Sequence, residues 1–246
     1  MKIKMFFLYG IVILLLVLFI LRIRNVKNKA LNIKVKKIEA QKAERETLLK
    51  EVHHRVKNNL QVITGLLSLQ SSYIENSSIK EMFNQSQYRI NSMAMVHEML
   101  YKSENLSQIK FNAYLMSLVN SLILSTKGNN NNIKLNIDIL DVALRISTAV
   151  PLGLMVNEIL TNALSHGIKG DDEGEITIKL EKISSSRYTL IIGDNGVGCP
   201  DNITFNNSPS LGLRLMYKLA RQLNGSIEKI PSMKGCHYKI DFEEAE

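Results

Sequence analysis

Residues 49–67 read LKEVHHRVKNNLQVITGLL, and the order of apolar and polar residues in this stretch decides how the first half of the chain folds. Its apolar residues recur every three or four positions, which is the spacing of one face of an α-helix. They are Leu49, Val52, Val56, Leu60, Ile63 and Leu67. Residues 27–72 contain no proline and one glycine. The pattern therefore predicts one long amphipathic helix.

Two adjacent histidines lie in this stretch and point in different directions, because successive helical residues are rotated by about 100°. His53 lies at the edge of the apolar stripe, whereas His54 falls on the polar side of the helix. A neutral imidazole nitrogen is a competent nucleophile near pH 7, so His54 is a candidate phosphoryl acceptor. Glu51, one turn earlier, is a candidate to hold the other ring nitrogen. An inert, solvent-facing histidine is the alternative interpretation.

A second helix is predicted over residues 78–102, after a short turn at residues 73–78. Its apolar residues also recur at helical spacing: Ile79, Met82, Phe83, Ile90, Met93, Val96 and Leu100. Two such helices form an antiparallel hairpin. One hairpin cannot bury both apolar stripes well, so we expect a homodimer in which two hairpins form a four-helix bundle.

An uncharged apolar run, MFFLYGIVILLLVLFIL, occupies residues 5–21. As a helix rising about 1.5 Å per residue it nearly crosses a hydrocarbon core of about 30 Å, which predicts a transmembrane anchor. A cleaved signal peptide is the alternative, but the run exceeds the usual apolar region of about 7–15 residues. More basic residues follow the run than precede it. This asymmetry predicts a single pass through the cytoplasmic membrane, with the catalytic part in the cytoplasm.

The formal charge of +8 comes from the N-terminal segment. Residues 1–38 hold nine basic residues and no acidic residue, so the rest of the chain is nearly neutral. A nucleic-acid-binding protein carries its basic residues on the folded domain, so we expect no nucleic-acid partner. The two cysteines, Cys199 and Cys236, have no metal-ligand spacing and suggest no disulfide framework. They are interpreted as ordinary thiols in a reducing compartment.

From about residue 105 the pattern changes to a mixture of helices and strands. A helix is predicted near 112–126 and a strand at 134–139. A further helix opens after Thr148, with Pro151 in its first turn. It carries Glu158 and Asn162, four residues apart and therefore on one face. An amide oxygen can bind Mg²⁺ directly and a carboxylate can bind it or orient a water molecule, so this pair is a candidate magnesium–triphosphate site.

Two strands, 175–183 and 188–192, lead into a glycine-rich turn that contains Asp194, Gly196 and Gly198. The glycines permit close backbone approach, and the carboxylate can accept a hydrogen bond from the exocyclic amine of adenine. A plain hairpin turn is the alternative. The polar stretch 200–209 is a candidate lid that leads to a helix N-terminus. Strands at 226–230 and 236–242 complete a mixed sheet covered by helices.

Together, these segments resemble the two-component histidine kinases of the HisKA_2 type, close to the HWE group, with a catalytic domain of the GHKL ATPase superfamily. The resemblance covers residues 45–242. The acceptor motif matches residues 51–61, and the second-helix signature matches residues 89–94 and 97–101. The nucleotide motifs match at Asn157, Glu158 and Asn162, at Asp194, Gly196 and Gly198, at Leu211, Gly212 and Leu213, and at Gly235.

The resemblance implies that His54 is phosphorylated, that Asn162 binds magnesium with Glu158 beside it, and that Asp194 recognises adenine. Three positions depart from the family pattern: Arg55 follows His54, Ser165 stands where a phosphate-facing lysine is common, and Cys199 replaces an aliphatic residue. Glu51 and Lys169 are candidate substitutes for the missing acid and lysine. Asn58, one turn after His54, stands where related kinases keep a residue that helps to dephosphorylate the partner.

We therefore expect an α+β protein with a transmembrane helix, a helical hairpin in a dimeric bundle and an α/β sandwich of the GHKL type. The expected divisions are an anchor (1–24), a helical linker (25–44), a phosphotransfer domain (45–104) and an ATP-binding domain (105–246). The expected activity is autophosphorylation of His54 from ATP and Mg²⁺, followed by transfer to an aspartate of a response regulator. A separate sensor protein is a further candidate partner. The alternatives are a catalytically dead binding module and an ATPase that forms no phosphoprotein.

Overall fold

The computed structural model describes residues 2–103, 105–128, 132–168, 173–200, 204–206, 208–231 and 234–244, except for the side chains of residues 2–9 and 11–14. The chain divides into two compact units, residues 1–49 and residues 50–246. Helix α1 (Lys2–Ser72) begins in the first unit and ends in the second. The functional motifs of the sequence all lie in the second unit.

The first unit is helical, and the side chains described in it are exposed. Among the side chains that are described, no helical stretch is both long and apolar enough to span a bilayer. Residues 5–9 and 11–14 of the predicted anchor at 5–21 lie outside that description, so the anchor is not confirmed. The predicted linker, residues 25–44, lies within α1.

The second unit opens with the predicted helical hairpin. Helix α1 ends at Ser72, and α2 (Ser77–Lys102) begins after a short turn. Asn76 caps α2, because its side-chain oxygen accepts hydrogen bonds from the first free backbone amides of the helix. Side chains join the two helices along their length, from Thr64 to Asn91 near the turn and from Lys57 to Glu98 farther away. The hairpin is therefore antiparallel, as predicted.

A five-stranded mixed sheet forms the other end of this unit, with the strand order β2-β4-β5-β7-β6. Its strands are β2 (Ile133–Ile139), β4 (Gly174–Lys182), β5 (Arg187–Asp194), β6 (Ser226–Lys229) and β7 (Cys236–Glu243). β2 pairs with β4 in parallel, and the other pairs are antiparallel. Alternate residues of β4 are buried, so one face of the sheet carries the core.

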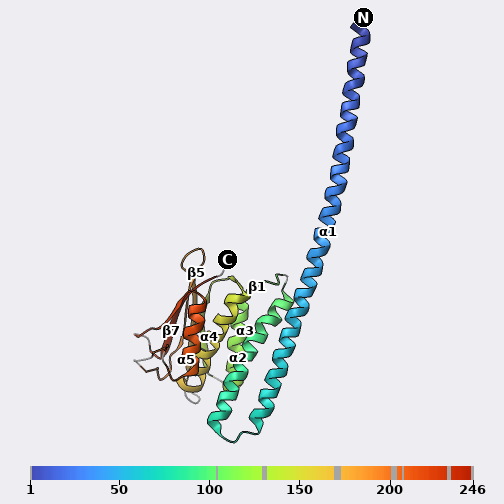
Figure 1. Cartoon of the computed structure of the whole chain (residues 1–246). Coiled ribbons are helices and arrows are strands. Elements are labelled where there is room, and N and C mark those ends of the chain that lie inside the picture. The colour runs from blue at the N-terminus through green and yellow to red at the C-terminus, as the bar shows by residue number, and fades with distance from the viewer. Residues whose placement is uncertain are drawn as a thin grey trace. The chain divides into compact units, whose positions relative to one another are not determined.

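Three helices and a π-helical turn cover that face: α3 (Phe111–Lys127), α4 (Ile146–Asn162), η1 (Ala163–Gly167) and α5 (Leu211–Gln222). Helix α4 is buried along almost its whole length, because it contacts α2, α3 and α5 as well as β5 (Figure 1). One hydrophobic core runs from Val96 and Leu100 of α2 through α4 to the sheet. The hairpin and the sheet are thus joined through α4.

Two local expectations were wrong. Helix α4 begins at Ile146 rather than after Thr148, so Pro151 lies inside the helix and not in its first turn. The reason is a small two-stranded sheet of β1 (Gln108–Lys110) and β3 (Ala143–Arg145), which the sequence analysis missed and which leads directly into α4. Strands of three residues are too short to leave a periodic pattern in the sequence.

The expectation of two ordinary thiols was also wrong, because Cys199 and Cys236 form a disulfide. Cys236 begins β7 directly opposite Asp194, the last residue of β5, and Cys199 lies in the turn that follows β5. The pairing of β5 with β7 therefore brings together two cysteines that are 37 residues apart in sequence. The interpretation of free thiols failed because it considered the spacing of the cysteines and not this strand register.

Candidate functional site

The two adjacent histidines lie on different faces of α1, as predicted. His54 is exposed on α1, with its ring centre 5.4 Å from that of Tyr101 on α2. The Asn58 side-chain nitrogen lies 3.5 Å from Nδ1 of His54. An amide can serve as donor or acceptor, so Asn58 can support either tautomer of His54 from this side. The other ring nitrogen, Nε2, then remains the candidate nucleophile.

His53, in contrast, is buried between the two helices. Its Nε2 lies 3.2 Å from the Leu106 carbonyl oxygen, and its Nδ1 lies 3.1 Å from Nδ1 of His97. A proton on Nε2 is donated to Leu106, so His97 Nδ1 donates to His53 Nδ1. Burial lowers the pKa of His97, and the electrostatic influence of the adjacent His53 lowers it further. His53 therefore has a structural role, and of the two histidines His54 is the one open to an incoming group.

Glu51, the candidate orienting acid, is engaged elsewhere. Its Oε1 accepts a hydrogen bond from Nε of Arg55 at 2.7 Å. Both side chains are more than half exposed, so this ion pair is weak and readily exchanged. In the described part of the chain, no hydrogen bond joins Glu51 to His54. The structure thus brings Asn58, rather than Glu51, next to the candidate acceptor.

A cavity of about 230 Å³ lies between the end of α4, the start of α5 and the adjoining ends of β5 and β7. Four of the predicted site residues line it: Asn162, Asp194, Gly198 and Leu213. The volume is below the roughly 300–1,000 Å³ of a pocket for a whole ligand, so the cavity suits one part of a larger molecule. The other lining residues are Ile159, Ala163, His166, Gly167, Cys199, Pro200, Ser210, Cys236 and Tyr238.

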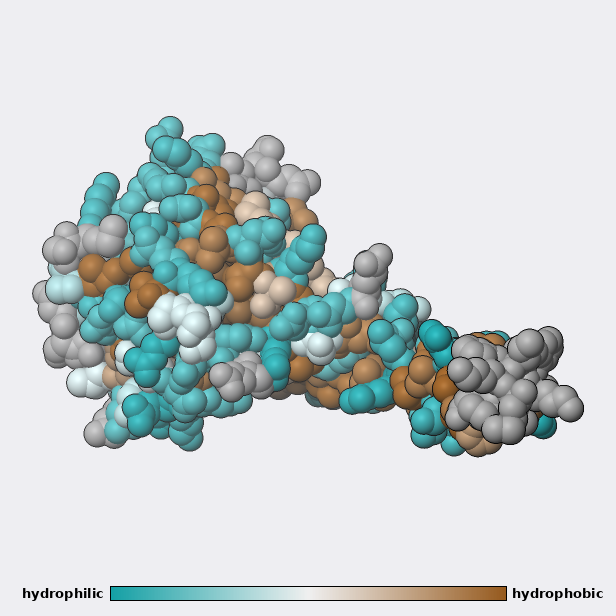
Figure 2. Space-filling model, turned by 90° about the horizontal axis from the view of Figure 1, so that it is seen from above, coloured by the Kyte–Doolittle hydropathy of each residue, from teal (hydrophilic) through white to brown (hydrophobic). Residues whose placement is uncertain are grey.

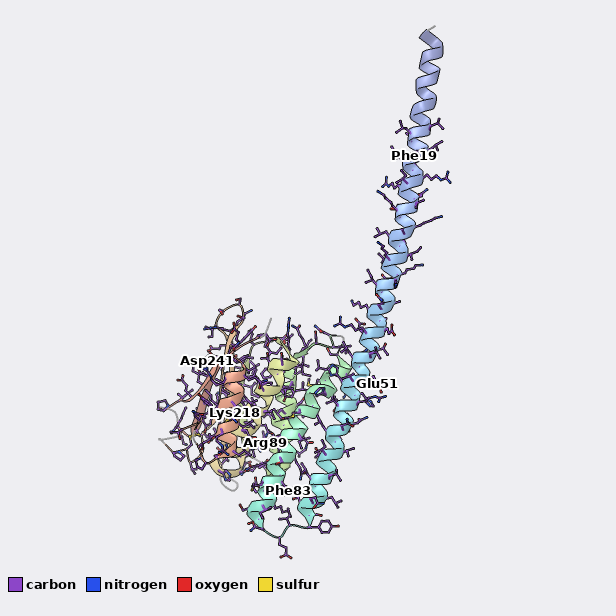
Figure 3. All side chains as sticks on the ribbon, viewed as in Figure 1. Phe19, Glu51, Phe83, Arg89, Lys218 and Asp241 are labelled. Atoms are coloured by element: carbon purple, nitrogen blue, oxygen red, sulfur yellow. A yellow bond between two sulfur atoms is a disulfide. The ribbon has the colours of Figure 1, made fainter. Side chains whose placement is uncertain are left out.

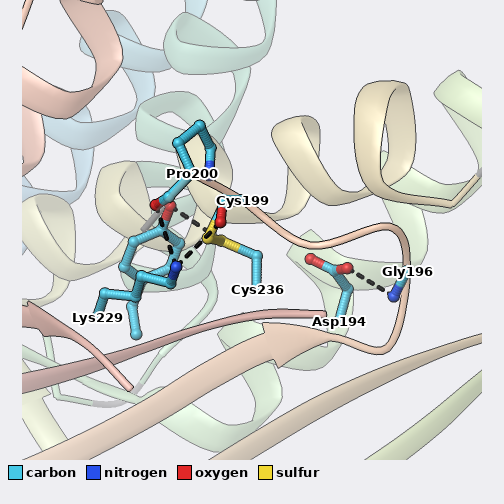
Figure 4. Close-up of a disulfide and its surroundings, with 7 residues drawn as sticks. Asp194, Gly196, Cys199, Pro200, Lys229 and Cys236 are labelled. Atoms are coloured by element: carbon cyan, nitrogen blue, oxygen red, sulfur yellow. Dashed lines mark hydrogen bonds between the residues drawn. A yellow bond between two sulfur atoms is a disulfide. The ribbon is translucent and has the colours of Figure 1, made fainter. Parts of the chain in front are cut away.

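Asp194 is the acidic residue of this cavity and is 3% exposed. Its Oδ1 accepts a hydrogen bond from the backbone amide of Gly196 at 2.8 Å (Figure 4). Burial raises the pKa of Asp194, and this backbone bond and His237 oppose the rise. A carboxylate in such a position is suited to accept a hydrogen bond from an amine, and protonation weakens it as an acceptor because the negative charge is lost.

The glycine-rich turn after Asp194 is packed tightly against the π-helical turn η1. The backbone amide of Val197 donates to the Gly167 carbonyl oxygen at 3.0 Å. A Cβ atom on Gly196 would lie 2.2 Å from that same oxygen, so this position requires glycine. Gly235 is equally confined, because its Cβ would lie 1.9 Å from the backbone oxygen of Asp194. These glycines fix the backbone around Asp194.

The predicted residues Asn157 and Glu158 are buried and do not line this cavity. Glu158 instead forms an ion pair with Arg89 of α2, which donates from Nε to Oε1 at 2.6 Å and from Nη2 to Oε2 at 2.7 Å. Gly212, at the start of α5, adjoins this carboxylate: its Cβ would lie 2.6 Å from Oε2 of Glu158. The Asn157 side-chain oxygen has no hydrogen-bond partner among the described residues.

Arg89 was noticed in the sequence only as part of the second-helix signature, and no spacing rule relates it to a residue 69 positions away. Leu211, predicted beside Gly212, is 57% exposed at the first turn of α5. Ser165 is exposed on η1, and its proposed substitute Lys169 lies outside the described residues.

The disulfide forms part of the cavity wall, because both Cys199 and Cys236 line it. The hydroxyl of Tyr238 lies 3.2 Å from the Cys236 sulfur. Lys229 donates from Nζ to the backbone oxygens of Cys199 and Pro200 (Figure 4). The first residues after the glycine-rich turn are thus tied to β6 and β7 on the side of the cavity opposite α4.

Two family models match the chain. Residues 51–126 match the HisKA_2 model, described as histidine kinase, and residues 147–246 match the model described as histidine kinase-, DNA gyrase B-, and HSP90-like ATPase. The first match extends through α3, beyond the hairpin. The second match includes all of the elements that line the cavity, namely α4, η1, β5, α5 and β7.

Curated relatives are also similar. The sensor histidine kinase PdtaS of Mycolicibacterium smegmatis is 30% identical over 189 residues, which cover 74% of this chain and 36% of that protein. The blue-light-activated histidine kinase 2 of Erythrobacter litoralis is 26% identical over 202 residues, covering 79% of this chain and 56% of the relative. The chain therefore spans between about a third and just over half of the length of these relatives.

A solved structure shows the same fold. The histidine kinase domain of the Erythrobacter litoralis EL346 blue-light-activated kinase superimposes with a TM-score of 0.59 at 23% sequence identity. The match covers 81% of this chain and 94% of that domain. The arrangement of hairpin, covering helices and mixed sheet is thus one that an experimentally determined protein adopts.

Proposed function

The chain belongs to the histidine kinases of the HisKA_2 type, and we propose that it phosphorylates its own His54 from ATP and passes the phosphoryl group to an aspartate of a response regulator. One observation carries this proposal. A single compact unit holds an exposed histidine on a helical hairpin and a cavity lined by Asn162 and Asp194. An acceptor and a candidate nucleotide site thus belong to the same folded body.

His54 supplies the nucleophile. When the Asn58 amide is turned so that its oxygen accepts a proton carried by His54 Nδ1, Nε2 presents a lone pair to solvent. That lone pair forms a bond to the γ-phosphorus of ATP, the bond from this phosphorus to the bridging oxygen breaks, and ADP leaves. Such transfers depend mainly on positioning and on neutralising charge, so an exposed imidazole with one fixed nitrogen is sufficient on the acceptor side.

The cavity residues fit a purine nucleotide. Asp194 accepts a hydrogen bond from the exocyclic amine of adenine, while Ile159, Ala163 and Leu213 provide apolar surface for the ring. Asn162 stands at the cavity edge of α4, where its amide oxygen is a suitable Mg²⁺ ligand. Magnesium, when bound, neutralises charge on the phosphates. The buried Asn157 oxygen, in the same helix, is a further acceptor without a hydrogen-bond partner among the described residues.

The exposed apolar residues of the hairpin support a second copy of the chain as partner. Within the second unit, large apolar side chains are left uncovered on both hairpin helices, including Val62, Leu66, Leu69, Ile79 and Met82. Pairing of two hairpins buries such a stripe, which favours the predicted four-helix bundle. The apolar run at residues 5–21 supports attachment to the cytoplasmic membrane, with the second unit in the cytoplasm. We propose the divisions 45–104 and 105–246 as phosphotransfer and ATP-binding domains.

The test is incubation of the full chain with γ-labelled ATP and Mg²⁺, followed by acid and alkali treatment of the labelled protein. We expect an adduct that is labile in acid and stable in alkali, and we expect His54→Gln to abolish it. The matched control is His53→Gln, whose amide can still donate to Leu106 and which should retain the label. Labelling of His54→Gln at the wild-type rate would show that the acceptor is another residue.

A second arm separates the kinase from its alternatives. Asp194→Asn removes the charged acceptor in the cavity without changing its shape, and a hydrogen bond to a charged group is worth about 1.5–3 kcal/mol, so nucleotide affinity should fall roughly ten- to a hundredfold. Continuous phosphate release without any labelled histidine would favour an ATPase. Absence of nucleotide binding by the wild type would favour a binding module.

A further inference from the structure

A largely buried ion pair with two short hydrogen bonds joins the hairpin to the α/β part. Arg89 of α2 (Figure 3) donates from two nitrogens to the two carboxylate oxygens of Glu158 on α4, at 2.6 and 2.7 Å. Such a bidentate arrangement is the strongest geometry available to a guanidinium and a carboxylate. The Arg89 and Glu158 side chains are only 15% and 7% exposed. Solvent therefore screens the interaction little.

Holding two helices together does not require such a pair. Two well-packed apolar residues of similar volume often hold a buried contact as well or better, because no charge has to be removed from water. On the C-terminal side of Arg89, the core already joins α2 to α4 through Val96, Leu100 and their apolar neighbours. A buried ion pair at this place is therefore better explained by a function that requires the contact between α2 and α4 to form and to separate.

The position of Glu158 indicates what that function is. Glu158 precedes Asn162 by four residues on the same face of α4, and its Oε2 adjoins Gly212 at the first turn of α5. Its carboxylate thus lies where the hairpin, the proposed magnesium ligand and the helix after the lid region meet. While a guanidinium occupies both oxygens, this carboxylate is charge-neutralised and is a weaker partner for a cation or for a water molecule bound to one.

We propose that Arg89 is a positioning residue that links docking of the hairpin to the magnesium–nucleotide site: it sequesters Glu158 when the hairpin is docked and releases it when Mg²⁺-ATP binds. This inference rests on the proposed function. Arg89 and a hydrated magnesium ion compete for one carboxylate, so each weakens the other. By linkage, Mg²⁺-ATP must loosen the contact of α2 with α4 by the same factor by which docking weakens Mg²⁺-ATP.

The first test is calorimetric binding of a non-hydrolysable ATP analogue to the full chain, with and without magnesium. Removing the guanidinium in Arg89→Gln should tighten binding of the magnesium complex at least fivefold, the lower end of typical coupling between sites. Binding of the analogue without magnesium should change by less than twofold. The matched control is Lys80→Gln, which removes an exposed charge from the same helix and should leave both affinities unchanged.

A double-mutant cycle distinguishes this role from a structural one. In a Glu158→Gln background the sequestered group is absent, so adding Arg89→Gln should no longer tighten the magnesium complex. A purely structural Arg89 would instead weaken binding with and without magnesium, and it would do so in both backgrounds. Either that pattern or an unchanged affinity in Arg89→Gln overturns the proposal.

Wild-type protein provides an independent test that does not depend on a variant folding. Hydrogen exchange of the α2 backbone around Arg89 should become at least fivefold faster when the magnesium complex of the analogue is bound than when the analogue is bound alone. Equal exchange rates in the two states overturn the proposed role of Arg89 and leave the proposed function intact. No binding of the analogue by the wild type would overturn both.

Discussion

The helical hairpin and the α/β part of the second unit differ in how completely each buries its apolar residues. In the α/β part, α4 is buried along nearly all of its length and the inward residues of β4 are covered. The outer half of the hairpin leaves large apolar side chains exposed on both helices, such as Leu66 and Met82. Figure 2, which views the molecule from above, shows apolar residues in brown exposed among hydrophilic residues in teal on that face. The α/β part thus has a complete hydrophobic core, whereas the outer half of the hairpin leaves part of its apolar surface exposed.

The difference follows from what each region contacts. Near its C-terminal end α2 packs on α3 and α4, and there Val96 and Leu100 are fully buried. Toward the turn at residues 73–76 the hairpin has only its two helices, and two helices cannot cover both of their apolar stripes. The sequence of the hairpin thus specifies more apolar surface than one chain can bury. The apolar residues left exposed can pack against the hairpin of a second copy of the chain.

The largest expected effect separates a buried leucine from an exposed one. Leu160→Ala removes a fully buried side chain from α4 and should lower the unfolding free energy by about 2–5 kcal/mol. The same change at Leu66, which is 58% exposed, should alter the free energy of the monomer by less than about 0.5 kcal/mol. Urea titrations at low protein concentration measure both values.

The dimer reverses this ranking for Leu66. At high protein concentration Leu66→Glu should halve the mass seen by light scattering, because a charge would be buried between the two hairpins. Leu160→Ala should leave the mass unchanged under conditions where it is folded. A wild-type chain that stays monomeric at every concentration would contradict the four-helix bundle and would leave the exposed stripe without its proposed function.

A somewhat smaller effect is expected from the disulfide, which lies entirely in the α/β part. Closing a loop of 37 residues limits the unfolded chain, and this contribution is typically about 2–4 kcal/mol. Reduction with a thiol should therefore destabilise this part and leave the helicity of the hairpin unchanged. Amide exchange in β7 measures the first effect, and circular dichroism measures the second. Equal protection of β7 in reduced and oxidised protein would show that pairing with β5 and β6 is sufficient to hold this strand.

The smallest expected effect is a pH dependence confined to the hairpin. The pKa of His97 is lowered below its ordinary value of 6.5, first by burial and then by His53, which faces it from α1. Between the two pKa values the unfolded chain binds a proton that the folded hairpin excludes. The stability of the hairpin should thus fall as the pH is lowered from 7.5 through 6.5, and level off below the depressed pKa.

Local hydrogen exchange of the amides around His53 measures this dependence. His97→Gln should flatten it, because the glutamine can still hydrogen-bond His53 but does not titrate. The same pH dependence in His97→Gln as in the wild type would assign it to another group, such as His237 in β7, whose pKa burial also lowers.

Periodicity and motifs were sufficient to predict the hairpin, the five strands of the larger sheet and four of the residues that line the cavity. The turn at 73–76 and the ends of α2 could be predicted because Asn76 and the two apolar stripes are local signals. The Arg89–Glu158 pair and the Cys199–Cys236 bond could not, since both depend on which elements pack together. Local patterns thus located the candidate site, while the contacts that would regulate it required the tertiary structure.

Beside the cavity, the number of residues in the π-helical turn η1 matters more than which residues they are. At the end of this turn, the amide of Ile168 bonds to the carbonyl oxygen five residues back, at Ala163, instead of four. Deleting one residue such as Ser165 would convert the turn to an ordinary α-helix and rotate everything after it by about 100° relative to α4. Gly167 would then no longer meet Val197. A gap of one position in this segment of a homologous gene would thus mark a reshaped cavity, even where every nucleotide motif is intact.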